Sequence, residues 1–119
     1  MTSQTPSDCL FCKIVAGEIP SDRVAESERS IAFRDISPAA PIHVLVVPRR
    51  HEPTIGALAA VSPEDLTDVF RLASLVAEQE GVADAHRMIV NTGSDVGQTI
   101  FHAHVHLLAG AAFSERRMV

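Results

Sequence analysis

The spacing of apolar residues along the chain predicts one long helix. Ser62 is a good N-cap residue, Pro63 suits the first position of a helix, and Gly81 can end one. Between them, apolar side chains recur every three or four residues, which is the period of one helix face. These side chains belong to Leu66, Val69, Phe70, Ala73, Val76 and Ala77. We therefore expect a helix over residues 63–80 that packs on a sheet.

Shorter apolar runs predict the sheet itself. The polar segment 27–30 lies between two of these runs and suits a hairpin turn. The run 43–48 is apolar and rich in β-branched residues, as in a central strand covered on both faces. The expected strands are residues 23–26, 31–35, 43–48, 87–91 and 100–108. With a short helix at 9–16 before them, this order predicts an α+β fold with a small, mainly antiparallel sheet and one main helix.

The length of 119 residues suits one domain with its own core, so we expect a single domain over residues 1–119, with residues 1–8 as a disordered leader. A net charge of −5 and the absence of Trp and Tyr argue against a nucleic-acid partner, because such binding uses cationic and aromatic side chains. The N-terminal segment is polar, and no stretch approaches the roughly 20 apolar residues that span a bilayer. These features predict a cytoplasmic protein without a membrane contact.

Three of the six histidines lie within five residues, at His102, His104 and His106. Single apolar residues separate them, so a strand would direct the three imidazoles to one face and Ala103 and Val105 to the other. An exposed polar face would alternate in the same way, but such a face is normally made of Lys, Glu, Thr or Ser. The run therefore predicts one face for chemistry and one face for the core.

The same spacing limits what the three histidines can do together. Alternate residues of a strand are about 6.5–7 Å apart, so His102 and His106 would be about 13 Å apart, too far to bind one zinc ion. At most two of the three could share a metal. An imidazole beside the flexible loop 93–97 suits nucleophilic or acid–base chemistry near neutral pH.

Other polar side chains have a plain structural interpretation at this stage. His86 is isolated in a polar turn and is expected in solvent. Arg49 and Arg50 follow a strand, where they would either be solvated or bind a phosphate.

The run from Gln98 to Leu108 resembles the signature of the histidine triad (HIT) family, His-x-His-x-His followed by apolar residues. Further segments resemble blocks of the Hint branch of that family and occur in the same order. These segments are residues 33–38, 41–43, 47–51 and 91–98. Because the blocks together cover most of the chain, it is identified as a member of the HIT family.

The resemblance implies a HIT-like fold and a homodimer. The five-stranded sheets of two protomers would join into one ten-stranded sheet, with a nucleotide site in each protomer. His104 falls on the family's nucleophile, which attacks the α-phosphorus of a nucleotide and forms a nucleotidyl-histidine that water hydrolyses. His106 and His43 fall on histidines that contact phosphate or orient the nucleophile. Thr99 stands where Hint proteins often have Ser, and it keeps the hydroxyl that assists the leaving group.

The resemblance also implies the residues that bind the nucleotide. They are Phe33, Asp35, Ile36, His43, Asn91, Gly97, Gln98, Thr99, His104 and His106. Asp35 falls on the carboxylate that binds the ribose hydroxyls, and Asn91 on the asparagine beside the phosphate. Without the resemblance, Asp35 would be interpreted as a turn residue, Asn91 as a strand-end cap and His43 as a core histidine.

Cys9 and Cys12 form a Cys-x-x-Cys pair, which by itself suits apolar filler, a redox couple or half of a metal site. A structural zinc needs four ligands, usually Cys and His, and the candidates here are His51 and His102. In galactose-1-phosphate uridylyltransferase, a distant relative, and in some bacterial HIT proteins, the corresponding positions form a Cys₂His₂ zinc site. The resemblance therefore implies a structural zinc on these four residues, and no catalytic metal is required.

Together these expectations describe a nucleotide hydrolase or transferase that acts at the α-phosphorus. Purine nucleoside phosphoramidates are the natural substrates, because a nucleotidyl-histidine and a phosphoramidate both contain a P–N bond. Two alternatives stay open: hydrolysis of dinucleoside polyphosphates by the same attack, and a zinc- or nucleotide-binding adaptor without catalysis. The chain departs from the Hint pattern after the triad, because residues 109–119 lack the Trp-Pro-Pro-Gly tail typical of that branch.

Overall fold

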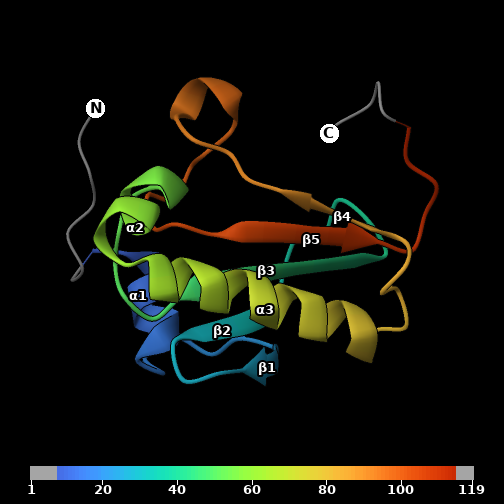
Figure 1. Ribbon diagram of the computed structural model, residues 1–119, viewed down its shortest axis with the longest axis horizontal. Helices are drawn as coiled ribbons and strands as arrows, with labels where there is room; N and C mark the ends of the chain where they lie inside the picture. Colours follow the sequence, from blue (N-terminus) through green and yellow to red (C-terminus); the bar gives the residue numbers. More distant parts are fainter. Residues whose placement is uncertain (1–7, 115–119) are drawn as a thin grey trace.

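A single antiparallel sheet of five strands, in the order β1–β2–β3–β5–β4, organises the protein (Figure 1). The computed structural model describes residues 8–114, so the leader expected at 1–8 lies outside the described residues except for Asp8. The strands are β1 (Arg23–Glu26), β2 (Ser30–Arg34), β3 (Ile42–Pro48), β4 (His86–Ile89) and β5 (Val105–Ala109). Every neighbouring pair is antiparallel, which confirms the expected α+β fold and five-stranded sheet.

The main helix, α3 (Pro63–Gln79), lies across one face of the sheet (Figure 1). Its start is the predicted one, because the Ser62 hydroxyl accepts a hydrogen bond from the Asp65 N–H at 3.2 Å. The described helices α1 (Leu10–Val15) and α3 were both expected, whereas α2 (Ile55–Val61) was not. Only seven residues long, α2 shows little periodicity, and its one local signal is the Thr54 N-cap. None of the described helices is long and apolar enough to cross a membrane.

Two clusters of buried side chains cover the two faces of the sheet. The first lies under α3 and includes Val44 and Val46 of β3. The second lies under α1 and includes Leu45 and Val47 of the same strand. Residues 43–48 are all buried, so the prediction of a central strand covered on both faces is confirmed.

The last strand is shorter than expected, because β5 begins at Val105 rather than at residue 100. Before that point the chain leaves the sheet, and the Ala103 N–H donates to the Glu52 carbonyl at 2.7 Å. The alternation of side chains nevertheless persists. Ala103 and Val105 pack in the cluster under α3, while the histidine rings face α1, where Phe11 packs against the rings of His102 and His104. The expected chemical face is therefore also a buried face.

His86 lies differently from the expectation, while Arg49 and Arg50 are partly exposed and also form ion pairs. His86 begins β4, is half-buried, and its Nδ1 donates to the Val82 carbonyl at 2.7 Å. Arg49 pairs with Glu26 at 3.2 Å and Arg50 with Asp65 at 2.8 Å. Both guanidinium groups therefore link separate segments of the fold. The local sequence does not reveal their partners, because Glu26 and Asp65 lie far from the two arginines along the chain.

Candidate functional site

Three histidines meet where β3 and β5 run side by side. His43 and His106 come from these strands, and the Nε2 of His43 lies 2.9 Å from the Nδ1 of His106. The ring of His104, just before β5, lies 5.0 Å from that of His106 between centroids. The structure therefore brings together three residues that the sequence analysis assigned to catalysis.

His104 is held with one nitrogen available as a nucleophile. Its Nδ1 lies 2.7 Å from the backbone carbonyl of His102 and donates to it, which leaves the lone pair on Nε2. Burial lowers the pKa of His104 below its ordinary value, because the side chain is only 8% exposed. The imidazole is thus neutral at neutral pH, the state in which it can attack phosphorus.

His43 and His106 form a chain of hydrogen bonds with a defined direction. The Ala39 N–H donates to the Nδ1 of His43 at 3.0 Å, so the proton of a neutral His43 is on Nε2. That Nε2–H donates to the Nδ1 of His106, which places the proton of His106 on its Nε2. Burial, then the neighbouring His104 and His43, lower the pKa of His106 to about 4. A neutral N–H donor therefore stands beside the nucleophile.

A cavity of about 250 Å³ lies beside the histidines and has mostly apolar walls. Phe33, Asp35 and Ile36, which the sequence analysis assigned to a nucleoside pocket, all line it. Ile36 is 98% exposed, so a large apolar side chain stands uncovered at this cavity. Phe11 also lines the cavity, and its ring packs edge-on against that of His104 at 5.1 Å. The cavity and the nucleophile therefore share a wall.

Asp35 lies in a turn and also borders the cavity. Its Oδ1 accepts a hydrogen bond from the Ser37 N–H at 2.7 Å, as in a turn residue. Its Oδ2 lies 3.6 Å from the Nε2 of His43 and the side chain lines the cavity. A single carboxylate thus shapes the turn and borders both the histidines and the cavity.

The segment between β4 and the triad holds the other expected contacts. Asn91 is half-buried, and Gly97 and Thr99 are exposed, with Gly97 at a φ of +100° that favours glycine. The side chain of Gln98 differs from the expectation. It is buried, accepts from the Gly93 N–H and donates to the carbonyls of Pro53 and Ile100. Its polar atoms therefore hold this loop in place.

Sequence reasoning missed the part that α1 plays in the cavity wall. Leu10, Phe11 and Ile14 all line the cavity, although they precede the first strand. The sequence predicted this helix but carried no signal for its neighbours, because the packing depends on residues that are far apart in the chain.

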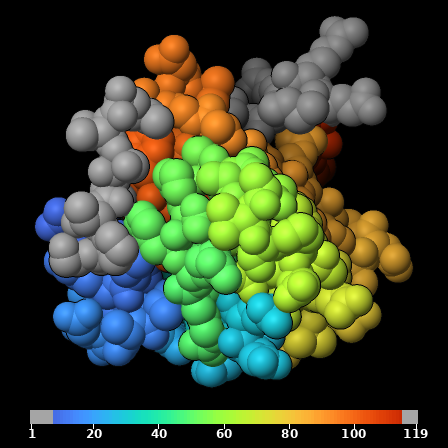
Figure 2. All heavy atoms as spheres, turned by 60° about the vertical axis from the view of Figure 1, so that its left-hand side comes forward, coloured from blue at the N-terminus to red at the C-terminus, as the bar shows by residue number. Residues whose placement is uncertain are grey.

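Cys9, Cys12, His51 and His102 lie together next to this site, with their four ligand atoms within 4.8 Å of one another. The Nδ1 atoms of the two histidines are 3.3 Å apart, and each lies 3.2–3.5 Å from a cysteine Sγ. A tetrahedral zinc, with bonds of about 2.0 Å to nitrogen and 2.3 Å to sulfur, would need ligand separations of roughly 3.3–3.8 Å. In Figure 2, α1 in blue and the segment before α2 in green lie next to each other on the surface.

The protonation of the cluster also suits a metal. His102 donates its Nε2–H to the Pro48 carbonyl at 2.8 Å, so its Nδ1 presents a lone pair to the cluster. Burial and the neighbouring Cys9 raise the pKa of the Cys12 thiol to about 12, so a thiolate there requires a cation. The four residues could therefore bind a metal ion.

A second group, Asp35, His43 and His106, is equally close-packed. It suits a metal less well, because the Ala39 N–H occupies the Nδ1 of His43 and keeps the proton on the Nε2 that faces the group. Because of this difference in protonation, the group of two cysteines and two histidines suits a metal ion. Asp35, His43 and His106 suit a hydrogen-bonded cluster without one.

Comparison with known proteins decides the family, because residues 16–113 match the family described as HIT domain. The chain belongs to the HIT family. It is 43% identical to the purine nucleoside phosphoramidase of Escherichia coli over 104 residues, which are 87% of each chain. It is also 42% identical to the 14 kDa zinc-binding protein of Zea mays over 106 residues, 87% of this chain and 83% of the other.

Solved structures of HIT proteins agree with this fold. A HIT family hydrolase from Clostridium thermocellum superposes with a TM-score of 0.90 at 40% identity, covering 97% of this chain and 100% of the other. The expectations of a HIT-like fold and of a hydrolase are thereby confirmed. The roles of single residues in this HIT protein stay predictions.

Proposed function

We propose that this HIT protein hydrolyses purine nucleoside phosphoramidates through a nucleotidyl-histidine on His104. The observation that carries the proposal is the protonation of the histidines, with a lone pair on the Nε2 of His104 and an N–H donor on His106 beside it. The adjoining cavity of about 250 Å³ suits a nucleoside. The similarity to the phosphoramidase of Escherichia coli supports the choice of leaving group.

In the first step, the Nε2 of His104 attacks the α-phosphorus and the bond from phosphorus to the leaving nitrogen breaks. The departing nitrogen takes up a proton from solvent water, which the water consumed in the second step returns, and the Thr99 hydroxyl donates a hydrogen bond to this nitrogen. The imidazole becomes cationic while it carries the nucleotide, and the His102 carbonyl then accepts a stronger, charge-assisted hydrogen bond from its Nδ1–H. His106 donates its Nε2–H to a phosphate oxygen and so stabilises the developing negative charge.

In the second step, water attacks the same phosphorus, the bond to His104 breaks, and a nucleoside monophosphate leaves. Asp35 accepts hydrogen bonds from the ribose hydroxyls, while Phe33 and Ile36 contact the base on apolar surfaces. None of these steps requires a catalytic metal. Cys9, Cys12, His51 and His102 would hold a structural zinc, which would cross-link α1 to the segment before β5. The name of the zinc-binding relative from Zea mays supports this part of the proposal. We also propose a cytoplasmic location, which rests on the sequence features alone.

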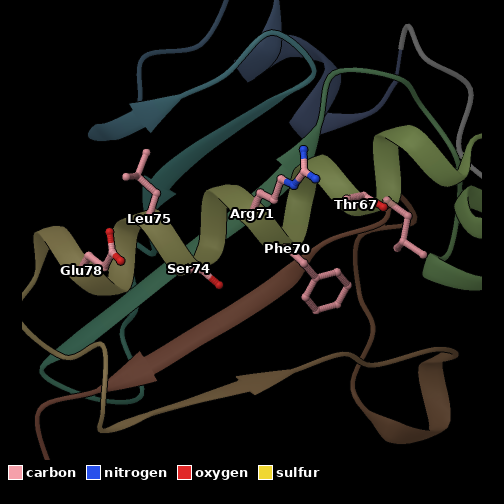
Figure 3. Close-up of a pocket in the computed structure, with 7 residues that line it drawn as sticks. Thr67, Phe70, Arg71, Ser74, Leu75 and Glu78 are labelled. Atoms are coloured by element: carbon pink, nitrogen blue, oxygen red, sulfur yellow. The ribbon is translucent and has the colours of Figure 1, made fainter.

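The active form is proposed to be a homodimer. β4 is an edge strand of the sheet, so its outer edge could pair with a second copy. A groove of about 570 Å³ lies on the outer face of α3, and its apolar walls include Leu66, Phe70 and Leu75. Figure 3 shows the side chains that line this groove along α3. A second copy that pairs along β4 and covers this groove would join two sheets into one of ten strands.

The proposed function is tested by following the turnover of adenosine phosphoramidate and of a diadenosine polyphosphate side by side, with AMP binding measured on the same protein. Faster turnover of the phosphoramidate is expected. A preference for the polyphosphate would instead favour dinucleoside polyphosphate hydrolysis, and AMP binding without turnover would favour the adaptor alternative. A base-quenched reaction should carry one nucleotidyl group on His104 by mass spectrometry, and its absence under turnover would contradict the covalent step.

A further inference from the structure

Helix α1 belongs to two sites at once. Cys9, its N-cap residue, and Cys12 supply both sulfur atoms of the metal centre. Leu10, Phe11 and Ile14 line the nucleoside cavity. The match to the family begins at residue 16, so this helix lies outside the segment that identifies the family. The two sites therefore share an element that precedes the matched family segment.

The geometry of a helix places the two sets of side chains on different sides. Successive residues are about 100° apart around a helix axis, so Leu10, Phe11 and Ile14 fall on one side. Cys12 falls on the opposite side, next to His51 at 3.2 Å between Sγ and Nδ1. A helix that is held at the metal centre thus presents a fixed apolar surface to the cavity.

Besides the buried side chains of Phe11 and Ile14, which pack in the cluster under it, the helix is held by polar contacts at its two ends. With only six residues it is too short to be stable by itself. At its C-terminal end, the Arg23 guanidinium donates to the carbonyls of Ile14 at 2.7 Å and Val15 at 3.3 Å. At its N-terminal end, the contacts of Cys9 and Cys12 with His51 and His102 hold the helix. The end that carries Leu10 and Phe11 is the one that the metal centre would hold.

We infer that metal binding at the Cys9–Cys12–His51–His102 centre and nucleotide binding in the cavity strengthen each other through α1. The inference rests on the proposed function, because it takes a purine nucleoside monophosphate as the ligand of the cavity. A bound metal holds Phe11 between the cavity and His104, whereas its loss frees the N-terminal end of α1 and leaves one cavity wall unsupported. By thermodynamic linkage, the nucleotide then tightens metal binding by the same factor.

The first experiment measures AMP affinity by calorimetry on protein with one Zn²⁺ per chain and on the same protein after removal of Zn²⁺ by a chelator. We expect affinity for AMP to fall about tenfold on metal loss, within the usual range for coupled sites. In the reciprocal measurement, Zn²⁺ affinity against a competing chelator should rise by the same factor when AMP is saturating. Circular dichroism of the metal-free protein accompanies both measurements, because AMP would also raise Zn²⁺ affinity through folding alone if that form unfolded.

Two variants of α1 test the route. Phe11→Ala removes the ring that joins the helix to His104, so it should still bind Zn²⁺ while the ratio of AMP affinities with and without metal falls towards one. Val15→Ala is the matched control, because Val15 packs beside the same cluster, does not line the cavity, and should keep the wild-type ratio. Equal AMP affinities in both metal states, with no AMP effect on Zn²⁺ affinity, would overturn the inference alone. Failure of both forms to bind AMP would contradict the proposed function and the inference together.

Discussion

Backbone groups decide which nitrogen carries the proton in three histidines of the site. The carbonyls of Pro48 and His102 accept from His102 and His104, and the Ala39 N–H donates to His43. His102 and His104, two positions apart, therefore have their lone pairs on different ring nitrogens. The lone pair is on Nδ1 in His102 and on Nε2 in His104. The same residue type can therefore serve a metal centre and a nucleophile within three positions of the chain.

Removal of the nucleophile gives the first prediction at this scale. His104→Ala should lower the turnover of adenosine phosphoramidate more than 100-fold, equivalent to a loss of at least ~2.7 kcal/mol in barrier stabilisation. His86→Ala, a histidine outside the site, should keep wild-type turnover. AMP binding and thermal unfolding are measured on both variants, because His104 is buried against Phe11. A folded His104→Ala protein with more than about a hundredth of the wild-type rate would contradict covalent catalysis by His104.

The metal centre gives a second prediction for single residues. Protein purified without chelators should contain close to one zinc per chain by elemental analysis, because four suitable ligand atoms are already in place. The double variant Cys9→Ser/Cys12→Ser should contain almost none and should unfold at a lower temperature. Zinc-free wild-type protein of undiminished stability, with two freely titratable thiols, would show that the cysteines are apolar filler.

The start of α3 shows how an element is anchored by charge. Asp65 is buried, yet it accepts hydrogen bonds from Arg29 and Arg50, both at 2.8 Å. Burial opposes its ionisation, but the two arginines outweigh burial and hold the pKa of Asp65 below its ordinary value. The arginines come from the β1–β2 turn and from the segment after β3, so this carboxylate joins three parts of the fold.

The lowered pKa leads to a prediction for stability against pH. A depressed carboxylate pKa contributes stability that is complete above about pH 4 and is lost as the pH falls through the folded-state value. Asp65→Asn should therefore lower the free energy of unfolding by about 2 kcal/mol at pH 7, measured with urea, and this deficit should shrink as the pH falls below about 4. Glu64→Gln is the control, because Glu64 is 78% exposed and its pair with Arg29 is worth little. A deficit that is constant between pH 7 and pH 3 would contradict this account.

On the scale of the whole molecule, two features of the described residues could meet a second copy of the chain. One is the outer edge of β4, and the other is the groove along α3 in which Leu75 is 44% exposed. Paired strand edges and buried apolar side chains stabilise many symmetric dimers. Both features are explained together if a second copy of the chain covers them.

The proposed dimer gives the prediction at this scale. Sedimentation equilibrium at micromolar concentration should report twice the mass of one chain. Leu75→Glu should shift the protein towards the monomer, because it places a charge in an interface that excludes water. Ala16→Glu adds the same charge at an exposed position after α1 and should remain dimeric. A monomeric wild type would contradict the proposed dimer, and a dimeric Leu75→Glu would remove the α3 groove from its interface.

The local pattern of side chains was sufficient to predict those features that depend on one element alone. The three- and four-residue spacing and the Ser62 cap predicted α3, and the alternation around His104 predicted which side chains share a face. Both follow from the fixed geometry of helices and strands, which places a side chain according to its position in its own element. Family blocks added the residues of the nucleoside cavity, of which Phe33, Asp35 and Ile36 are found together.

Only the tertiary structure decided what depends on residues far apart in the chain. It set the start of β5 at Val105 and paired Arg50 with Asp65. It also buried the side chain of Gln98, whose hydrogen bonds hold its loop in place. It also placed α1 between the metal centre and the cavity, with Cys9 beside His102 across 93 positions of sequence. These contacts follow from how separate elements pack, since each buried polar group must find a partner wherever the fold provides one.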